Sequence, residues 1–111
     1  VTYTPPSDWV TFNSIGFTAP VAGSVMILVS ASFNCGGCDI GSNLRMGITT
    51  GSVPTDYVLF DAGYGREAVS TFAVFSVSEG TAYTFSAMFE STSFQSYTIY
   101  RSKIGYIFIP S

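Results

Sequence analysis

The sequence predicts an all-β domain, an antiparallel sandwich of about eight to ten strands. Short apolar stretches alternate with segments that contain Gly or Pro, and this alternation is typical of strands joined by turns. No stretch combines an apolar period of 3.6 residues with helix caps, so we expect essentially no helix. The 111 residues suffice for one compact core, and residues 9–111 are therefore expected to form a single domain.

The elements follow in order. Residues 1–8 contain Pro5-Pro6, which favours extended geometry and is unsuited to a central strand, so we expect an arm that leads into the domain. The segments between the strands carry Gly or Pro where a turn needs a fixed or positive φ. The expected strands are Trp9–Asn13, Ile15–Thr18, Ser24–Phe33, Leu44–Thr50, Tyr57–Asp61, Ala68–Val77, Thr81–Glu90, Tyr97–Tyr100 and Lys103–Ile109.

The composition is apolar and poor in charge. Hydrophobic residues make up 47% of the chain and charged residues 10%, whereas soluble proteins average about 25% charged. The 16 Ser and 12 Thr therefore have to supply most of the polar surface. With four basic residues and a net charge of −3, neither nucleic acid nor an anionic membrane is an expected partner. We expect an extracellular, cell-surface or virion protein.

The strand faces carry the most specific information. In Thr81–Glu90, alternate residues from Tyr83 to Phe89 are large and apolar, so this face is expected to point into the core. The opposite faces of this strand, of Ser24–Phe33 and of Lys103–Ile109 are also small or apolar, although a sheet with one wet face should alternate cleanly.

Something is therefore expected to cover this second face. No helix is predicted that could do so, and we expect further copies of the same chain to provide the cover. The alternative is that strand twist turns part of the face under loops or under the N-terminal arm. The residues expected at the contact between copies are Met26, Leu28, Met88, Gly105, Ile107 and Ile109.

The two cysteines, Cys35 and Cys38, lie in a Cys-Gly-Gly-Cys segment. We expect them to close a small disulfide ring in an oxidising compartment. A thioredoxin-type redox pair would need a helix after the second cysteine, and Asp-Ile-Gly-Ser starts a helix poorly. A zinc site would need ligands from several subunits, because the chain offers only two thiols.

The sequence offers few residues that could act in catalysis. There is no His, so the commonest general base is missing, and Lys103 is the only lysine that could replace it. The seven carboxylates all lie in or next to expected turns, where charges are usually solvated. Asp39–Asn43 offers oxygen ligands for calcium but lacks the further carboxylates of a strong loop. We expect neither an enzyme nor a bound metal or cofactor.

One block of the sequence resembles a known family. Gly16-Phe17-Thr18-Ala19-Pro20-Val21-Ala22-Gly23-Ser24-Val25 is similar to the Gly-x-Phe-Thr-x-Pro-x-x-Gly-x-Tyr block that opens the first long strand of C1q-like domains. The closing segment Ser102–Ile109 resembles the terminal strand of that family. Ser78–Phe85 occupies the place of the family's Gly-Asp-x-Val-x-Leu hairpin. The similarity in element order covers roughly residues 9 to 110.

The departures from that pattern point to its compact members. Val25 stands where the family has an aromatic residue, and Thr81 stands where it has an aspartate. These features favour the small C1q/TNF-like modules of bacterial surface proteins and phage fibres. The resemblance implies a ten-strand jelly roll that forms a homotrimer, with Gly105, Ile107 and Ile109 toward the threefold axis. It further implies a structural or adhesive role without catalysis.

A carbohydrate-binding function of the same fold is the alternative. Tyr57, Tyr64 and Arg66 lie in or beside the turn that begins at Asp61. Aromatic faces stack on sugar rings, and Arg and Asp orient hydroxyl groups through charge-assisted hydrogen bonds. The opposing interpretation is that these tyrosines pack at the edge of the sandwich. A glycan or surface receptor is thus the second expected partner, beside other copies of the chain.

Overall fold

The computed structural model describes residues 2–3, 7–35, 43–61, 65–91 and 97–111. These residues form an all-β antiparallel sandwich and include no helix, as the sequence predicts. The eight strands are β1 (Thr2–Tyr3), β2 (Ser7–Thr18), β3 (Gly23–Cys35), β4 (Asn43–Thr49), β5 (Tyr57–Asp61), β6 (Gly65–Val77), β7 (Ala82–Ser91) and β8 (Tyr97–Pro110).

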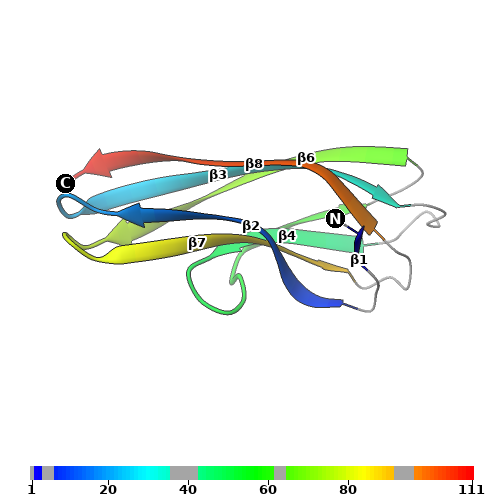
Figure 1. Ribbon diagram of the computed structural model, residues 1–111, viewed down its shortest axis with the longest axis horizontal. Coiled ribbons are helices and arrows are strands. Elements are labelled where there is room, and N and C mark those ends of the chain that lie inside the picture. The colour runs from blue at the N-terminus through cyan, green and yellow to red at the C-terminus, as the bar shows by residue number, and fades with distance from the viewer. Residues whose placement is uncertain (1, 4–6, 36–42, 62–64, 92–96) are drawn as a thin grey trace.

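The strands form two four-stranded sheets that pack face to face (Figure 1). Sheet A has the order β1-β8-β3-β6, and sheet B has the order β2-β7-β4-β5. Each strand of the first half of the chain pairs with one of the second half: β1 with β8, β2 with β7, β3 with β6 and β4 with β5. The long strands give an elongated molecule of 48 × 21 × 20 Å.

Two expected breaks in strands are absent. Trp9–Asn13 and Ile15–Thr18 are both part of β2, and Tyr97–Tyr100 and Lys103–Ile109 are both part of β8. Polar residues interrupt the apolar pattern at these points. The pairing register shifts there instead, so an irregularity or bulge absorbs the change while the strand continues.

The first residues of the chain belong to the sheets. Thr2 and Tyr3 pair with Thr98 and Tyr97 of β8, and β2 begins at Ser7. The part of the expected arm that the structure describes is therefore built into the sandwich of its own chain. Pro5-Pro6 lies outside the described residues.

The core lies between the sheets and is rich in phenylalanine. Phe33 from sheet A is fully buried, and its ring centroid lies 5.8 Å from that of Phe89 and 5.1 Å from that of Phe60. In β7, Phe85, Ala87 and Phe89 are buried. The core face predicted for this strand is confirmed.

Tight turns join the sheets at one end of the sandwich. Gly80 has a φ of 75°, which glycine adopts without strain, and its amide donates to the carbonyl of Ala19 at 2.8 Å. In the same turn the Ser78 amide donates to the Tyr83 hydroxyl at 2.9 Å. This backbone hydrogen bond lowers the pKa of Tyr83.

Candidate functional site

The outer face of sheet A divides into an apolar and a polar half. Pairing registers place its outward side chains in rows that run across β6, β3 and β8. We call the first group of rows the apolar half: Phe72–Leu28–Gly105, then Val74–Met26–Ile107, with Ile109 beyond them. We call the next two rows the polar half: Ser70–Ser30–Lys103 and Ala68–Ser32–Arg101.

The apolar half is open to solvent in the single chain. Leu28 is 40% exposed, and Phe72, Val74, Ile107 and Ile109 are each between 54% and 63% exposed. Together these side chains present on the order of 400–500 Å², in the upper part of the range for the largest apolar patch on a soluble monomer. The described part of the chain leaves them uncovered.

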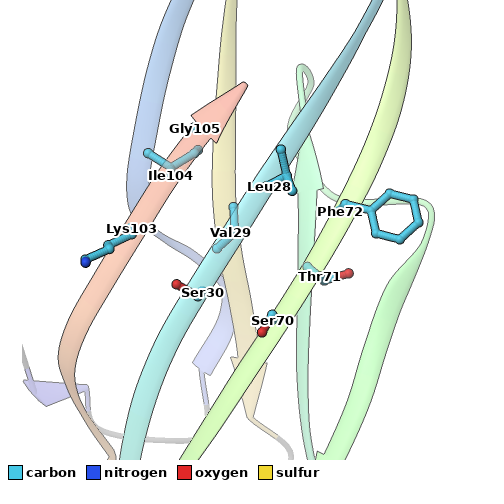
Figure 2. Close-up of a pocket in the computed structure, with 9 residues that line it drawn as sticks. All are labelled: Leu28, Val29, Ser30, Ser70, Thr71, Phe72, Lys103, Ile104 and Gly105. Carbon is cyan, nitrogen blue, oxygen red and sulfur yellow. The ribbon is translucent and has the colours of Figure 1, made fainter. Parts of the chain in front are cut away.

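A hollow lies where the two halves meet. Its volume is about 490 Å³, and its lining includes Leu28 and Phe72 from the apolar half and Ser30, Ser70 and Lys103 from the polar half. Phe72 and Lys103 lie at opposite margins of the hollow and their side chains point away from each other, with Ser30 and Ser70 between them (Figure 2). Nothing lies within 4 Å of where a Cβ of Gly105 would be, so this glycine leaves the floor open.

The outer face of sheet B is covered differently. Met88 lies on this face, where it pairs with Gly47 of β4, and it is only 7% exposed. The segment between β4 and β5 folds back outside the sheet (Figure 1), and Pro54 is buried so close to Gly47 that an added Cβ would lie 2.6 Å from its ring. Met88 therefore does not share the exposed face of Met26 and Leu28, and its own chain buries it.

An aromatic and charged cluster lies on the same outer face of sheet B. The ring centroids of Trp9 and Tyr57 are 5.8 Å apart, and the Arg45 guanidinium lies 5.0 Å from the centre of the Tyr57 ring. Arg45 also forms an ion pair with Glu90 across the β4–β7 pair, with an N···O distance of 3.3 Å. The Tyr57 side chain is 47% exposed. Of this cluster, only Tyr57 is among the residues that the sequence predicts to bind a ligand.

The structure describes the expected ligand-binding residues only in part. Tyr57 opens β5 and Asp61 closes it, so their Cα atoms lie about 13 Å apart along the strand. Arg66 lies on β6 of the other sheet, where it pairs with Asn34. Tyr64 lies outside the described residues.

The expected disulfide also falls outside what the structure describes. Cys35 is the last residue of β3, and its side chain is not among those described. Cys38 lies outside the described residues.

Within the ranges that the structure covers, no group of three or more His, Cys, Asp or Glu side chains could hold a metal ion. No helix among those residues is long and apolar enough to cross a membrane.

Pairing explains which surface residues the sequence analysis missed. Phe72 and Val74 lie beside Leu28 and Met26, yet the alternation in β6 puts Phe75 and Val77 on the other face, so the pattern alone does not select a side. Trp9, Arg45 and Glu90 come from three strands that are distant in sequence.

Comparisons with family models, curated proteins and solved structures give no match to this chain.

Proposed function

We propose that this protein is a jelly roll of the C1q/TNF type that works as a homotrimeric structural or adhesive module, without catalysis, on a phage virion or bacterial surface fibre. The protein would then be located outside the cell, on a virion or on the cell surface. The observation that carries the proposal is the apolar half of sheet A, which the described chain leaves open.

The strand order supports the jelly-roll assignment. A jelly roll arises when a long antiparallel ribbon is rolled up, so that the first strand pairs with the last, the second with the one before it, and so on inward. The pairs β1–β8, β2–β7, β3–β6 and β4–β5 follow this scheme and are divided between two sheets.

The apolar half has the properties of a contact between copies. It contains no charged side chain, so two such surfaces can meet without leaving an unpaired charge in the interface. At about 25 cal/mol per Å², burial of 400–500 Å² contributes roughly 10 kcal/mol per chain before the costs of association. A stable interface buries about 800 Å² per partner, so residues around the apolar half would have to contribute to the contact as well.

A threefold assembly is compatible with the arrangement of this face. Interfaces around a threefold axis join two different patches of neighbouring copies. The apolar half offers two flanks, with Phe72 and Val74 on β6 and Ile107 and Ile109 on β8. With the outer face of sheet A toward the axis, as the resemblance implies, the β6 flank of one copy would face the β8 flank of the next.

Ile107→Asp tests the proposed contact. A charge in the middle of the buried face should abolish assembly, and native mass spectrometry should then find single chains in place of trimers. Leu59→Asp is the matched control, because Leu59 is 57% exposed against 54% for Ile107 but lies on β5 in sheet B. This variant should remain trimeric.

The alternative outcomes are equally informative. A wild-type mass of one chain at micromolar concentration would refute the proposed assembly. A trimer that survives Ile107→Asp but dissociates in Leu59→Asp would place the contact on sheet B. Circular dichroism of both variants shows whether the strands remain folded.

The second candidate function is carbohydrate recognition, which the Trp9–Tyr57–Arg45–Glu90 cluster favours. The exposed part of Tyr57 provides an aromatic surface for a sugar ring, and the adjacent Arg45–Glu90 pair provides donors and acceptors for hydroxyl groups. Three copies in one assembly would add avidity to a weak single site.

A glycan array tests this second function. Binding of the wild-type protein that is lost in Tyr57→Ala would support recognition at sheet B. Tyr106→Ala is the matched control, since Tyr106 is also 47% exposed but lies on β8 in sheet A. An array without signal, or a signal that Tyr57→Ala leaves unchanged, would leave the structural role as the better account.

A further inference from the structure

The polar half of sheet A concentrates positive charge in a protein that is acidic overall. Lys103 and Arg101 are two of only four basic residues in a chain with a net charge of −3. They are two positions apart on β8, so their Cα atoms lie about 7 Å apart and both side chains leave the sheet on its outer side. Among the described residues, the one ion pair is Arg45–Glu90 on the opposite sheet.

Hydroxyl groups accompany these cations. Ser30 and Ser32 of β3 are the cross-strand neighbours of Lys103 and Arg101, and Ser70 of β6 follows Ser30 in the same row. A hollow of about 240 Å³ is lined by these three serines together with Arg101 and Lys103. Among the described residues that line this hollow and the adjoining one, none is a carboxylate.

The adjoining hollow adds an apolar wall. It shares Ser30, Ser70 and Lys103 with the smaller hollow and extends to Leu28 and Phe72 (Figure 2). One ligand could therefore place a charged group among the serines and cations and lay an apolar group against Phe72. The Lys103 ammonium points outward from the margin of β8 (Figure 2), and the long, flexible stem of the side chain has to turn for it to reach such a group.

We propose that the paired hollows bind a small amphiphilic anion, a molecule with a carboxylate, sulfate or phosphate beside an aromatic or aliphatic group. Lys103 and Arg101 hold the oxyanion by charge-assisted hydrogen bonds, and Ser30, Ser32 and Ser70 donate further ones. Phe72 and Leu28 pack against the apolar part. This site goes beyond the proposed assembly and lies at the margin of the apolar half. It requires the contact between copies to leave open the side of Phe72 and Leu28 that faces the polar half.

Three probes separate these contributions. Phenyl phosphate carries both parts of the proposed ligand, inorganic phosphate carries the anion alone, and phenol carries the ring alone. Isothermal titration of the wild-type protein should show phenyl phosphate binding about tenfold more tightly than inorganic phosphate, because only phenyl phosphate buries a ring. Phenol should bind more weakly than either.

Matched variants locate the site. Lys103→Gln should weaken phenyl phosphate and inorganic phosphate alike by about tenfold or more, as expected for loss of a charged hydrogen bond. Phe72→Ala should weaken only phenyl phosphate. Leu59→Asp lowers the net charge by the same one unit on sheet B and should leave both affinities unchanged, which excludes a general effect of net charge.

The results that would overturn the inference are distinct from those that test the assembly. Failure of both phosphates to bind at millimolar concentration, or equal binding by Lys103→Gln, refutes the site. Equal affinities for the two phosphates refute its apolar part. Native mass spectrometry on the same samples tests the trimer separately. If the protein is a trimer but binds neither phosphate, only the anion site is refuted. If it is a single chain that binds phenyl phosphate, only the proposed assembly is refuted.

Discussion

The outer faces of the two sheets both carry apolar side chains, but they differ in whether the chain itself covers them. Both carry apolar residues that a solvated sheet face would not have. On sheet B, the chain itself covers Met88, with the segment before β5 folded over Gly47 and with Pro54 buried there. On sheet A, the described chain leaves Leu28 and Ile107 exposed. An apolar outward position therefore indicates that a cover is needed, but not whether the same chain supplies it.

The two methionines offer the strongest test of this comparison. Met88→Ala should lower the free energy of unfolding by about 2–4 kcal/mol, because it leaves a cavity in a surface that the chain already covers. Met26→Ala, on the open face, should cost less than about 1 kcal/mol of unfolding free energy in a single chain. Urea unfolding measures both.

Dilution of the same two variants then separates folding from assembly. Met26→Ala should dissociate at a higher protein concentration than the wild type, whereas Met88→Ala should not. Equal unfolding costs for the two methionines would contradict the distinction between a self-covered and an open face.

Two glycines give the next largest contrast. A Cβ at Gly47 would lie 2.6 Å from the Pro54 ring and 2.7 Å from the Asp56 carbonyl oxygen, so Gly47→Ala should destabilise the fold by about 1–3 kcal/mol. A Cβ at Gly105 meets nothing within 4 Å, and Gly105→Ala should change stability by less than about 0.5 kcal/mol. Thermal unfolding at equal protein concentration compares them, and a loss at Gly105 as large as that at Gly47 would show that its hollow is occupied.

The charged residues give the smallest effects. Glu90→Gln breaks the partly exposed Arg45–Glu90 pair and should cost less than about 1 kcal/mol, with a loss that shrinks as salt screens the pair. Lys103→Gln removes a charge that has no ion-pair partner among the described residues, and its stability should match the wild type without added anion. Urea unfolding at low and high salt checks this difference.

The local sequence pattern was sufficient to predict the fold class and the core face of β7. The alternation that puts Phe85, Ala87 and Phe89 on one face holds in β7, because strand geometry fixes which residues share a face. Polar residues near Ser14 and Ser102 were poor guides to strand ends, since irregular pairing tolerates them within long strands. Propensity alone does not reveal such a continuation.

The surfaces were less predictable because they depend on which strands become neighbours. Met88 and Met26 have similar local sequence patterns but lie on different sheets. Arg45 and Glu90 pair only because β4 lies beside β7. Lys103 acquires its serine neighbours in the same way, from β3 and β6. A hydrophobic pattern shows which residues of a strand share a face, but not which strands become its neighbours.

The nested strand pairing has a consequence for how the molecule folds. The β4–β5 pair joins residues close in sequence, whereas β8 must return from the end of the chain to lie between β1 and β3. Contacts between such distant segments form slowly, since closing long loops costs entropy before the contacts form. We therefore expect β8 to dock late. Because Ile107 and Ile109 arrive with it, partner chains would meet a finished surface only at the last step of folding, which limits premature association.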